Sequence, residues 1–248
     1  MPDIHWNYQK WNNTFDWETK KPSWCENTPQ NEVDWRCIFF PRIASFLPAH
    51  RILEIAPGHG RWTHFLANQC EELTVVDLAP NCIAACKKRF ASLSHISYFV
   101  NDGLHLHCLA DSSIDFVFSF DSLVHCDANV IDSYLSHLSR ALTADGTGFI
   151  HHSNSAALSR IRDFGPTPVR GGRSTDVSAE IFEQLCRKYG LRCIVQEIIN
   201  WNSPEPIDCL SLFCRAGSKW DRGNAVFETL DFPERRTAAK RAFLQYVL

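Results

Sequence analysis

The sequence predicts an α/β protein built on one mostly parallel sheet that helices cover on both faces. Three observations support this prediction. Short apolar segments alternate with segments whose apolar residues recur every three or four positions, which is typical of β-α-β units. The last two apolar segments follow each other without a helix and predict a terminal antiparallel hairpin. A chain of 248 residues that is 45% hydrophobic is long enough to bury a full core.

The first 48 residues precede the predicted sheet. Residues 1–32 are polar but rich in tryptophan and show neither helical nor strand periodicity. They are too aromatic for a disordered tail, so we expect them to pack over another part of the protein. In residues 31–47 the apolar positions are spaced as in a helix, and Pro41 interrupts them, which predicts a kinked or two-part helix.

The sheet region supplies the alternation in order. Predicted strands and helices occupy 51–55, 62–69, 73–78, 82–91, 96–100, 114–120, 130–142, 146–152, 177–189, 191–201 and 207–215. Asp176 is the expected cap of the helix over 177–189. A last helix is expected over 234–247. We divide the chain into an aromatic-rich N-terminal lid and helix (1–48), a sheet domain (49–217) and a C-terminal helical extension (218–248).

Composition excludes several classes of partner. The net charge is −3 and the basic residues are scattered, so we expect no nucleic-acid partner. No apolar run approaches the roughly 20 residues of a membrane span, and the first residues do not resemble a signal peptide, which predicts a cytoplasmic protein without a membrane partner. The eleven cysteines are dispersed and never form C-x-x-C, so we interpret them as reduced thiols. We expect no metal ligands among Cys82, Cys86, His105, His107 and Cys108.

The turn APGHG after the first strand indicates a ligand site. Gly58 and Gly60 allow a close approach of the backbone where parallel strands end. Glu54 is expected to point a carboxylate at the mouth of this site. Asp77 ends the second strand, where it can accept hydrogen bonds from both hydroxyls of a ribose, and Asp102 follows the third strand, where it can meet an adenine amino group. Three acids at three successive strand ends describe a nucleoside site.

The pattern favours one cofactor over others. A dinucleotide site would show a third glycine, and a P-loop would continue with Gly-Lys-Ser/Thr; neither is present. Glu54, APGHG and Asp77 together resemble class I S-adenosylmethionine-dependent methyltransferases, with Ala56 in place of the usual first glycine. The resemblance covers 51–215 and implies a seven-stranded Rossmann-like sheet and S-adenosylmethionine as cofactor. It implies cofactor contacts, from the methionine end to the adenine, by Glu54, Ala56, Gly58, Gly60, Asp77, Leu78, Asp102 and Gly103.

The segment SFDSLVHC, residues 119–126, is expected to face the transferred methyl group. Phe120 is counted with the cofactor contacts, and no Asn/Asp-Pro-Pro-Tyr signature of amine or DNA methylation is present. Asp121 and His125 would share a face of a helical turn, and an imidazole can take the proton of a hydroxyl acceptor. In FIHHSN, only one of His151 and His152 is expected to point into the site, because strand neighbours face opposite ways. Either can be the base with Asp121 orienting it, and a divalent metal on Asp121 and the histidines stays an alternative.

The acceptor is less well defined by the residues. The N-terminal tryptophans offer flat faces for a sugar or an aromatic acceptor, and Arg170, Arg173 and Asp176 are candidates to bind its hydroxyls. A looser resemblance to bacterial methyltransferases of sugars and polysaccharides rests on EIAPGHGRWT, FSFDSLVH and GFIHHSN. We therefore hypothesise an O-methyltransferase acting on a hydroxyl of a saccharide or glycosylated small molecule. A phenol, carboxylate or amine acceptor, a non-catalytic cofactor-binding module and a homodimer stay open.

Overall fold

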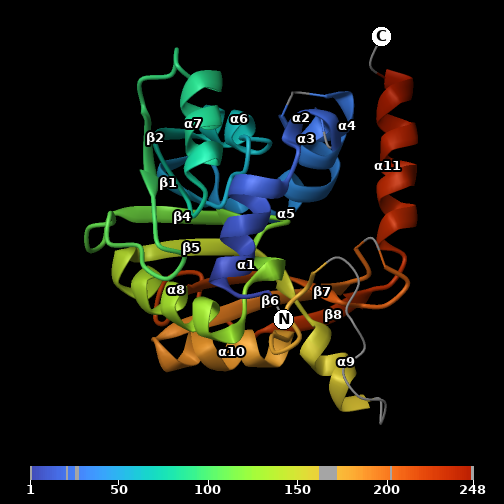
Figure 1. The fold of residues 1–248 in the computed structure, drawn as a ribbon. Coiled ribbons are helices and arrows are strands. Elements are labelled where there is room, and N and C mark those ends of the chain that lie inside the picture. The colour runs from blue at the N-terminus through green and yellow to red at the C-terminus, as the bar shows by residue number, and fades with distance from the viewer. Residues whose placement is uncertain (1, 21, 26–27, 162–171, 202, 247–248) are drawn as a thin grey trace.

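One eight-stranded sheet organises the molecule, as the computed structural model in Figure 1 shows for residues 2–20, 22–25, 28–161, 172–201 and 203–246. Helices lie on both faces of the sheet, which confirms the predicted α/β class. The strands are β1 (Ala49–Ile55), β2 (Cys70–Asp77), β3 (Ile96–Val100), β4 (Ile114–Ser119), β5 (Leu142–Ser153), β6 (Leu191–Ile199), β7 (Asp208–Arg215) and β8 (Ala225–Thr229).

The strand order places a ligand site at one edge of the sheet. The order is β3-β2-β1-β4-β5-β7-β6-β8, and only β7 runs antiparallel to its neighbours, β5 and β6. The chain moves from β1 outward to β2 and β3 and then returns to place β4 on the other side of β1. In open sheets ligands bind beyond the carboxyl ends of the strands at such a reversal.

Two apolar layers fix the helices on the sheet. On one face Ile52 and Phe116 belong to a buried cluster that also contains residues of α6 and α7. On the other face Leu53 and Val117 pack with α8 and α10. The helices are α1 (Ile4–Tyr8), α2 (Trp17–Lys20), α3 (Pro22–Cys25), α4 (Pro29–Val33), α5 (Phe40–Ile43), α6 (Thr63–Leu66), α7 (Pro80–Arg89), α8 (Ala128–Ala141), α9 (Ser155–Ile161), α10 (Ala179–Lys188) and α11 (Phe232–Tyr246).

The N-terminal segment forms short helices that its sequence pattern does not indicate. Asp3 caps α1, because its Oδ1 accepts a hydrogen bond from Trp6 N at 2.7 Å. A π-helical turn over Gln9–Thr14 follows. Asn7 Nδ2 then donates to the His125 carbonyl at 2.9 Å, and Asn81 Nδ2 of α7 donates to the Asn12 carbonyl at 2.8 Å. The segment thus spans from the end of β4 to the start of α7.

The predicted interrupted helix around Pro41 is confirmed in two parts. α4 passes through a π-helical stretch, Asp34–Phe39, into α5, whose first turn holds the proline. This placement is favourable because a first-turn residue needs no intrahelical N–H bond. A 3₁₀ turn, Ala44–Phe46, ends the segment.

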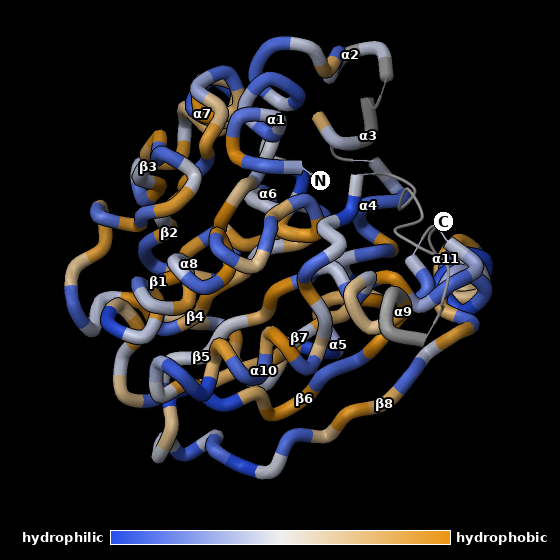
Figure 2. The backbone as a smooth tube through the Cα atoms, turned by 60° about the horizontal axis from the view of Figure 1, so that its bottom comes forward, coloured by the Kyte–Doolittle hydropathy of each residue, from blue (hydrophilic) through white to orange (hydrophobic). Residues whose placement is uncertain are grey.

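Two expectations for the C-terminal part need correction. Ser178, not Asp176, caps α10, since its Oγ accepts from Ile181 N at 3.2 Å. Asp176 instead accepts from the Ala128 N–H at 3.3 Å. The predicted last helix is present as α11, but β8 is an eighth strand that pairs in parallel with β6 at the edge of the sheet. Figure 2 shows β8 along this outer edge, beside β6. In the described ranges no helix has both the length and the apolar character that crossing a membrane would require.

Candidate functional site

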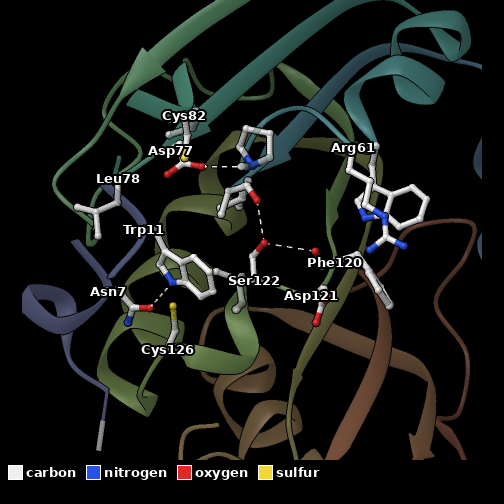
Figure 3. A pocket seen from close by; sticks show the side chains of 18 of the residues that line it. Asn7, Trp11, Arg61, Asp77, Leu78, Cys82, Phe120, Asp121, Ser122 and Cys126 are labelled. Atoms are coloured by element: carbon white, nitrogen blue, oxygen red, sulfur yellow. Dashed lines mark hydrogen bonds between the residues drawn. The ribbon is translucent and has the colours of Figure 1, made fainter. Parts of the chain in front are cut away.

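A pocket lies at the carboxyl ends of β1, β2 and β4, beneath the N-terminal segment. It encloses about 930 Å³ of space free of atoms, part of which is open to solvent. Asp77 lies on one side and Asp121 on another, with Ser122 between them (Figure 3). The N-terminal side chains in the wall are Ile4, Asn7, Trp11, Trp17 and Trp24.

The turn after β1 forms one wall of the pocket. Ala56 and Gly58 line it, and both adopt left-handed backbone conformations, with φ of 57° and 58°. A Cβ at Gly58 would lie 2.9 Å from the Trp17 ring, so this glycine lets the N-terminal segment contact the backbone closely. The Trp17 ring also stacks on His59, with centroids 4.4 Å apart.

Gly60 serves the packing of this turn rather than the pocket, contrary to its predicted place at the methionine end. It is not among the pocket-lining residues. A Cβ there would lie 2.5 Å from the Phe90 ring and 3.3 Å from Cys86 Sγ, and its φ is 81°. The glycine therefore allows the turn to pack against α7.

Glu54 does not point at the pocket mouth, which corrects a second prediction. It is 1% exposed and accepts a hydrogen bond from Thr63 Oγ1 at 2.5 Å. Burial raises the pKa of Glu54 to about 8. The side chain lies on the face of the sheet that α6 and α7 cover, so this carboxyl is part of the core beneath the turn.

Asp102 also departs from its predicted contact with adenine. Its side chain is 56% exposed and does not line the pocket. Oδ1 accepts from the N–H groups of Leu104 and His105, and Oδ2 lies 2.6 Å from His105 Nδ1. These bonds within its own loop hold the pKa of Asp102 well below its usual value, although the little burial it has acts the other way. The neighbouring Gly103 does line the pocket.

Asp77 occupies the position predicted for a ribose acid. It is 7% exposed, lines the pocket beside Leu78, and ends β2. Its Oδ1 accepts from Ala79 N at 2.8 Å and its Oδ2 from Gly58 N at 3.2 Å. Burial raises its pKa to about 6. Each carboxylate oxygen has a further lone pair, so the residue fits two ribose hydroxyls as donors.

The end of β4 forms the opposite wall with Phe120, Asp121 and Ser122. Asp121 has φ 58°, a strained conformation for a non-glycine residue, and its N–H donates to His151 Nδ1 at 3.2 Å. Ser122 Oγ donates to the Ala56 carbonyl at 2.8 Å and ties β4 to the turn after β1. Within the described ranges, the Asp121 carboxylate accepts no hydrogen bond.

His151 and His152 face opposite ways, as strand alternation predicts. His151 stacks on Phe120 with centroids 4.5 Å apart, on the pocket side of the sheet. His152 is a corrected candidate, because it stacks on Phe182 of α10 at 4.2 Å and its Nε2 lies 2.7 Å from Ser211 Oγ. Burial lowers its pKa to about 4, and it has no access to the pocket.

Neither His125 nor His151 lines the pocket. His125 packs near the rings of Trp6 and Trp11, and its Nδ1 lies 2.7 Å from the Gly172 carbonyl. Burial lowers the pKa of His125. His151 is fully buried and accepts from Asp121 at Nδ1, so its ring hydrogen resides on Nε2, 3.6 Å from Asp208 Oδ2.

The expected acceptor-binding residues take other partners. Arg173 is bound at its Nε and Nη2 by the two oxygens of Asp208, at 3.1 and 3.0 Å. Asp176 precedes α10 and accepts a hydrogen bond from the N–H of Ala128, the first residue of α8. Arg170 lies outside the described residues. In the described part of the chain no three His, Cys, Asp or Glu side chains converge in a way that could hold a metal ion.

Sequence reasoning missed several wall residues. Arg61 follows the glycine turn and lines the pocket on the Phe120 side, and Trp62 lies next to it. A basic residue directly after the turn was the available signal for Arg61. Nothing in the local pattern indicates three further wall residues, because they come from α7 and α8 through tertiary packing: Cys82, Val130 and Tyr134.

Comparison with known proteins identifies this architecture. Residues 52–146 match the family described as methyltransferase domain. A 55-residue stretch is 38% identical to nodulation protein S of Sinorhizobium fredii, covering 22% of this chain and 26% of that protein, so the match spans about a quarter of the relative.

Solved structures match over more of the chain. The N-methyltransferase NodS from Bradyrhizobium japonicum, in complex with S-adenosyl-L-homocysteine, has 20% identity and a TM-score of 0.60, covering 84% of this chain and 98% of that one. An S-adenosylmethionine-dependent methyltransferase from Clostridium acetobutylicum has 15% identity and a TM-score of 0.58, covering 77% and 94%. These structures extend the likeness beyond residues 52–146 and show that the chain has the fold of S-adenosylmethionine-dependent methyltransferases. The ligand in the Bradyrhizobium japonicum structure, S-adenosyl-L-homocysteine, is what S-adenosylmethionine becomes after it gives up its methyl group.

Proposed function

We propose that the protein transfers a methyl group to a hydroxyl of a small-molecule acceptor, of which a saccharide or glycosylated compound is the first candidate. S-adenosylmethionine supplies an electrophilic methyl on a sulfonium when bound. The observation that carries the proposal is the Asp121 carboxylate, which lines the pocket at the end of β4 and accepts no hydrogen bond within the described ranges. It is placed to take the hydroxyl proton as the new bond forms.

Asp121 replaces histidine as the proposed base. His125 and His151 do not line the pocket, and His152 lies on the other face of the sheet. We assign His151 a positioning role, because it accepts the Asp121 N–H and holds the left-handed backbone that turns the carboxylate toward the pocket. Its other nitrogen faces Asp208, which Arg173 fixes.

The walls support a saccharide acceptor. Trp11, Trp62 and Phe120 line the pocket and combine large apolar area with, in the tryptophans, a polar N–H. Trp11 Nε1 already donates to Asn7 Oδ1 at 3.1 Å, which fixes the orientation of its ring. Such rigid flat faces suit stacking against the apolar side of a sugar ring while its hydroxyls meet Asp121.

A second candidate acceptor is an amine. It is favoured by the 38% identity of a 55-residue stretch to nodulation protein S and by the likeness to a solved N-methyltransferase. A neutral amine needs no base before attack, and the Asp121 carboxylate would stabilise the cation that forms. The same residue would thus serve electrostatically instead of taking a proton first.

The test measures transfer of labelled methyl from S-adenosylmethionine to paired panels of sugars and amines. We expect Asp121→Asn to lower turnover of a hydroxyl acceptor by about 10²–10⁴-fold, as loss of a general base does, while S-adenosylhomocysteine affinity stays within about threefold. Asp132→Asn removes a half-buried acid of α8 that pairs with Lys188 and does not line the pocket, so it serves as the matched control, with unchanged turnover expected. Turnover of Asp121→Asn equal to that of the control would refute the proposal.

A further inference from the structure

Arg61 is a buried cation with one free nitrogen in the pocket wall. It is 8% exposed and stacks on Trp62, with the guanidinium carbon 4.2 Å from the ring centroid. Nε donates to Asn31 Oδ1 at 2.9 Å and Nη2 to Asp34 Oδ2 at 3.1 Å. Nη1 has no hydrogen-bond partner among the described residues. Figure 3 shows the guanidinium on the Phe120 side of the pocket, across from Asp77.

Arg61 shares its hydrogen-bonded acid with a second guanidinium group. Asp34 also accepts two hydrogen bonds from Arg236, at Nε and Nη2, both 2.6 Å long. One carboxylate therefore faces two guanidinium groups. Burial lowers the pKa of Arg61, and Asp121 is the acid that most strongly opposes this shift. Burying a cation is costly unless its N–H groups are hydrogen-bonded as well as balanced in charge, and Nη1 of Arg61 is not hydrogen-bonded by the described residues.

We infer that Arg61 binds the carboxylate of a ligand in this pocket. Nη1 is the nitrogen left to bind such a carboxylate, because Nε and Nη2 are taken by Asn31 and Asp34 and the side chain lines the pocket. A ligand with an α-amino-acid end carries a carboxylate of this kind. Two sources present it: the methionyl end of the cofactor, and an acceptor that is itself an amino acid. The inference rests on the proposed function for its cofactor.

The first arm of the test compares the binding of two cofactor analogues by calorimetry. S-adenosylhomocysteine carries the amino-acid end, and 5′-methylthioadenosine lacks it. If Arg61 binds the cofactor carboxylate, Arg61→Met weakens the affinity for S-adenosylhomocysteine by about 10–100-fold. The affinity for 5′-methylthioadenosine stays within about threefold of wild type, because only S-adenosylhomocysteine loses a hydrogen bond to a charged group.

Arg236→Met is the matched control. It disturbs the same Asp34 carboxylate, but Arg236 is not among the residues that line the pocket. We expect the affinity of this variant for both ligands to stay within about threefold of wild type. If Arg61→Met weakens both ligands alike, Arg61 only supports the fold of the pocket and the inference is wrong.

The second arm separates the acceptor from the cofactor. Protein saturated with S-adenosylhomocysteine is titrated with phenylalanine and with 2-phenylethylamine, which differ only in the carboxylate. The carboxylate belongs to the acceptor if Arg61→Met leaves the affinity for S-adenosylhomocysteine unchanged but removes a preference of the wild type for phenylalanine over 2-phenylethylamine. No effect of Arg61→Met in either arm overturns the inference. If wild type binds neither S-adenosylhomocysteine nor 5′-methylthioadenosine, the proposed function is wrong as well. If wild type binds 5′-methylthioadenosine but Arg61→Met has no effect, only the inference about Arg61 is wrong.

Discussion

At the residue scale, two acids at neighbouring strand ends have different surroundings, one in the pocket wall and one in the core. Asp77 lies in the pocket wall, and its oxygens accept from two backbone N–H groups. Glu54 lies under the turn and bonds Thr63 inside the core. Their positions in the sequence look alike, since each acid stands at or next to the last residue of a strand. Both side chains take the same face of the sheet, because Glu54 pairs with Val75, two residues before Asp77. The difference arises from their height on the strands: Asp77 is the last residue of β2, whereas Glu54 comes one residue before the end of β1 and lies deeper under the turn.

The buried Glu54 carboxyl predicts a pH dependence of stability. Its folded-state pKa of about 8 exceeds the ordinary 4.5, so the folded protein keeps a proton that the unfolded chain has released between these values. The stabilisation is complete below pH 4.5 and is lost as the pH rises through 8, by about 1.4 kcal/mol per pH unit in between. Glu54→Gln should remove this slope from urea unfolding measured between pH 6.5 and 8.

The exposed Glu71 provides the control for that measurement. Its side chain is 77% exposed and pairs only with His50 in the described part of the chain. Glu71→Gln should therefore keep the wild-type slope. Equal slopes for wild type and Glu54→Gln would contradict the burial of a protonated Glu54.

At the element scale, the N-terminal segment roofs the pocket and α7 helps to hold it there. The Asn81 side chain donates to the Trp11 and Asn12 carbonyls, and its N–H donates to Asn12 Oδ1 at 3.0 Å. These contacts hold the segment over a ligand in the pocket, so we expect their loss to ease its exit. Asn81→Ala removes the two side-chain bonds and should speed S-adenosylhomocysteine release several-fold in stopped-flow tryptophan fluorescence, since each is worth about 0.5–1.5 kcal/mol.

The control for the roof is Asn68→Ala. Asn68 Nδ2 donates to the His64 carbonyl at 2.8 Å, away from the N-terminal segment. Its loss should leave the release rate unchanged. Identical release from both variants and wild type would show that the segment does not limit ligand exit.

At the scale of the whole molecule, the sequence predicted the order of strands and helices better than the contacts of the site. Apolar alternation is a local signal, so the strands up to β7 and the helices between them could be recognised, except α9, which was not predicted. The edge strand β8 was missed because four of its five residues are exposed and no buried face marks it. The sequence misplaced three site residues because their contacts depend on tertiary packing. Asp102 bonds within its own loop, Gly60 packs against Phe90 and Cys86, and His152 stacks on Phe182.

Calorimetric titration of S-adenosylhomocysteine into wild type and Asp77→Ala, with NAD as the comparison ligand, tests the central claim most directly. The pocket described here predicts one binding site in wild type, at least tenfold weaker affinity in the variant because the ribose hydroxyls lose a buried charged acceptor, and no binding of NAD. The thermal midpoint of the variant shows that it is folded. Equal affinity of both proteins, or a preference for NAD, would contradict the assignment of Asp77 and of the pocket to the methyl-donor cofactor.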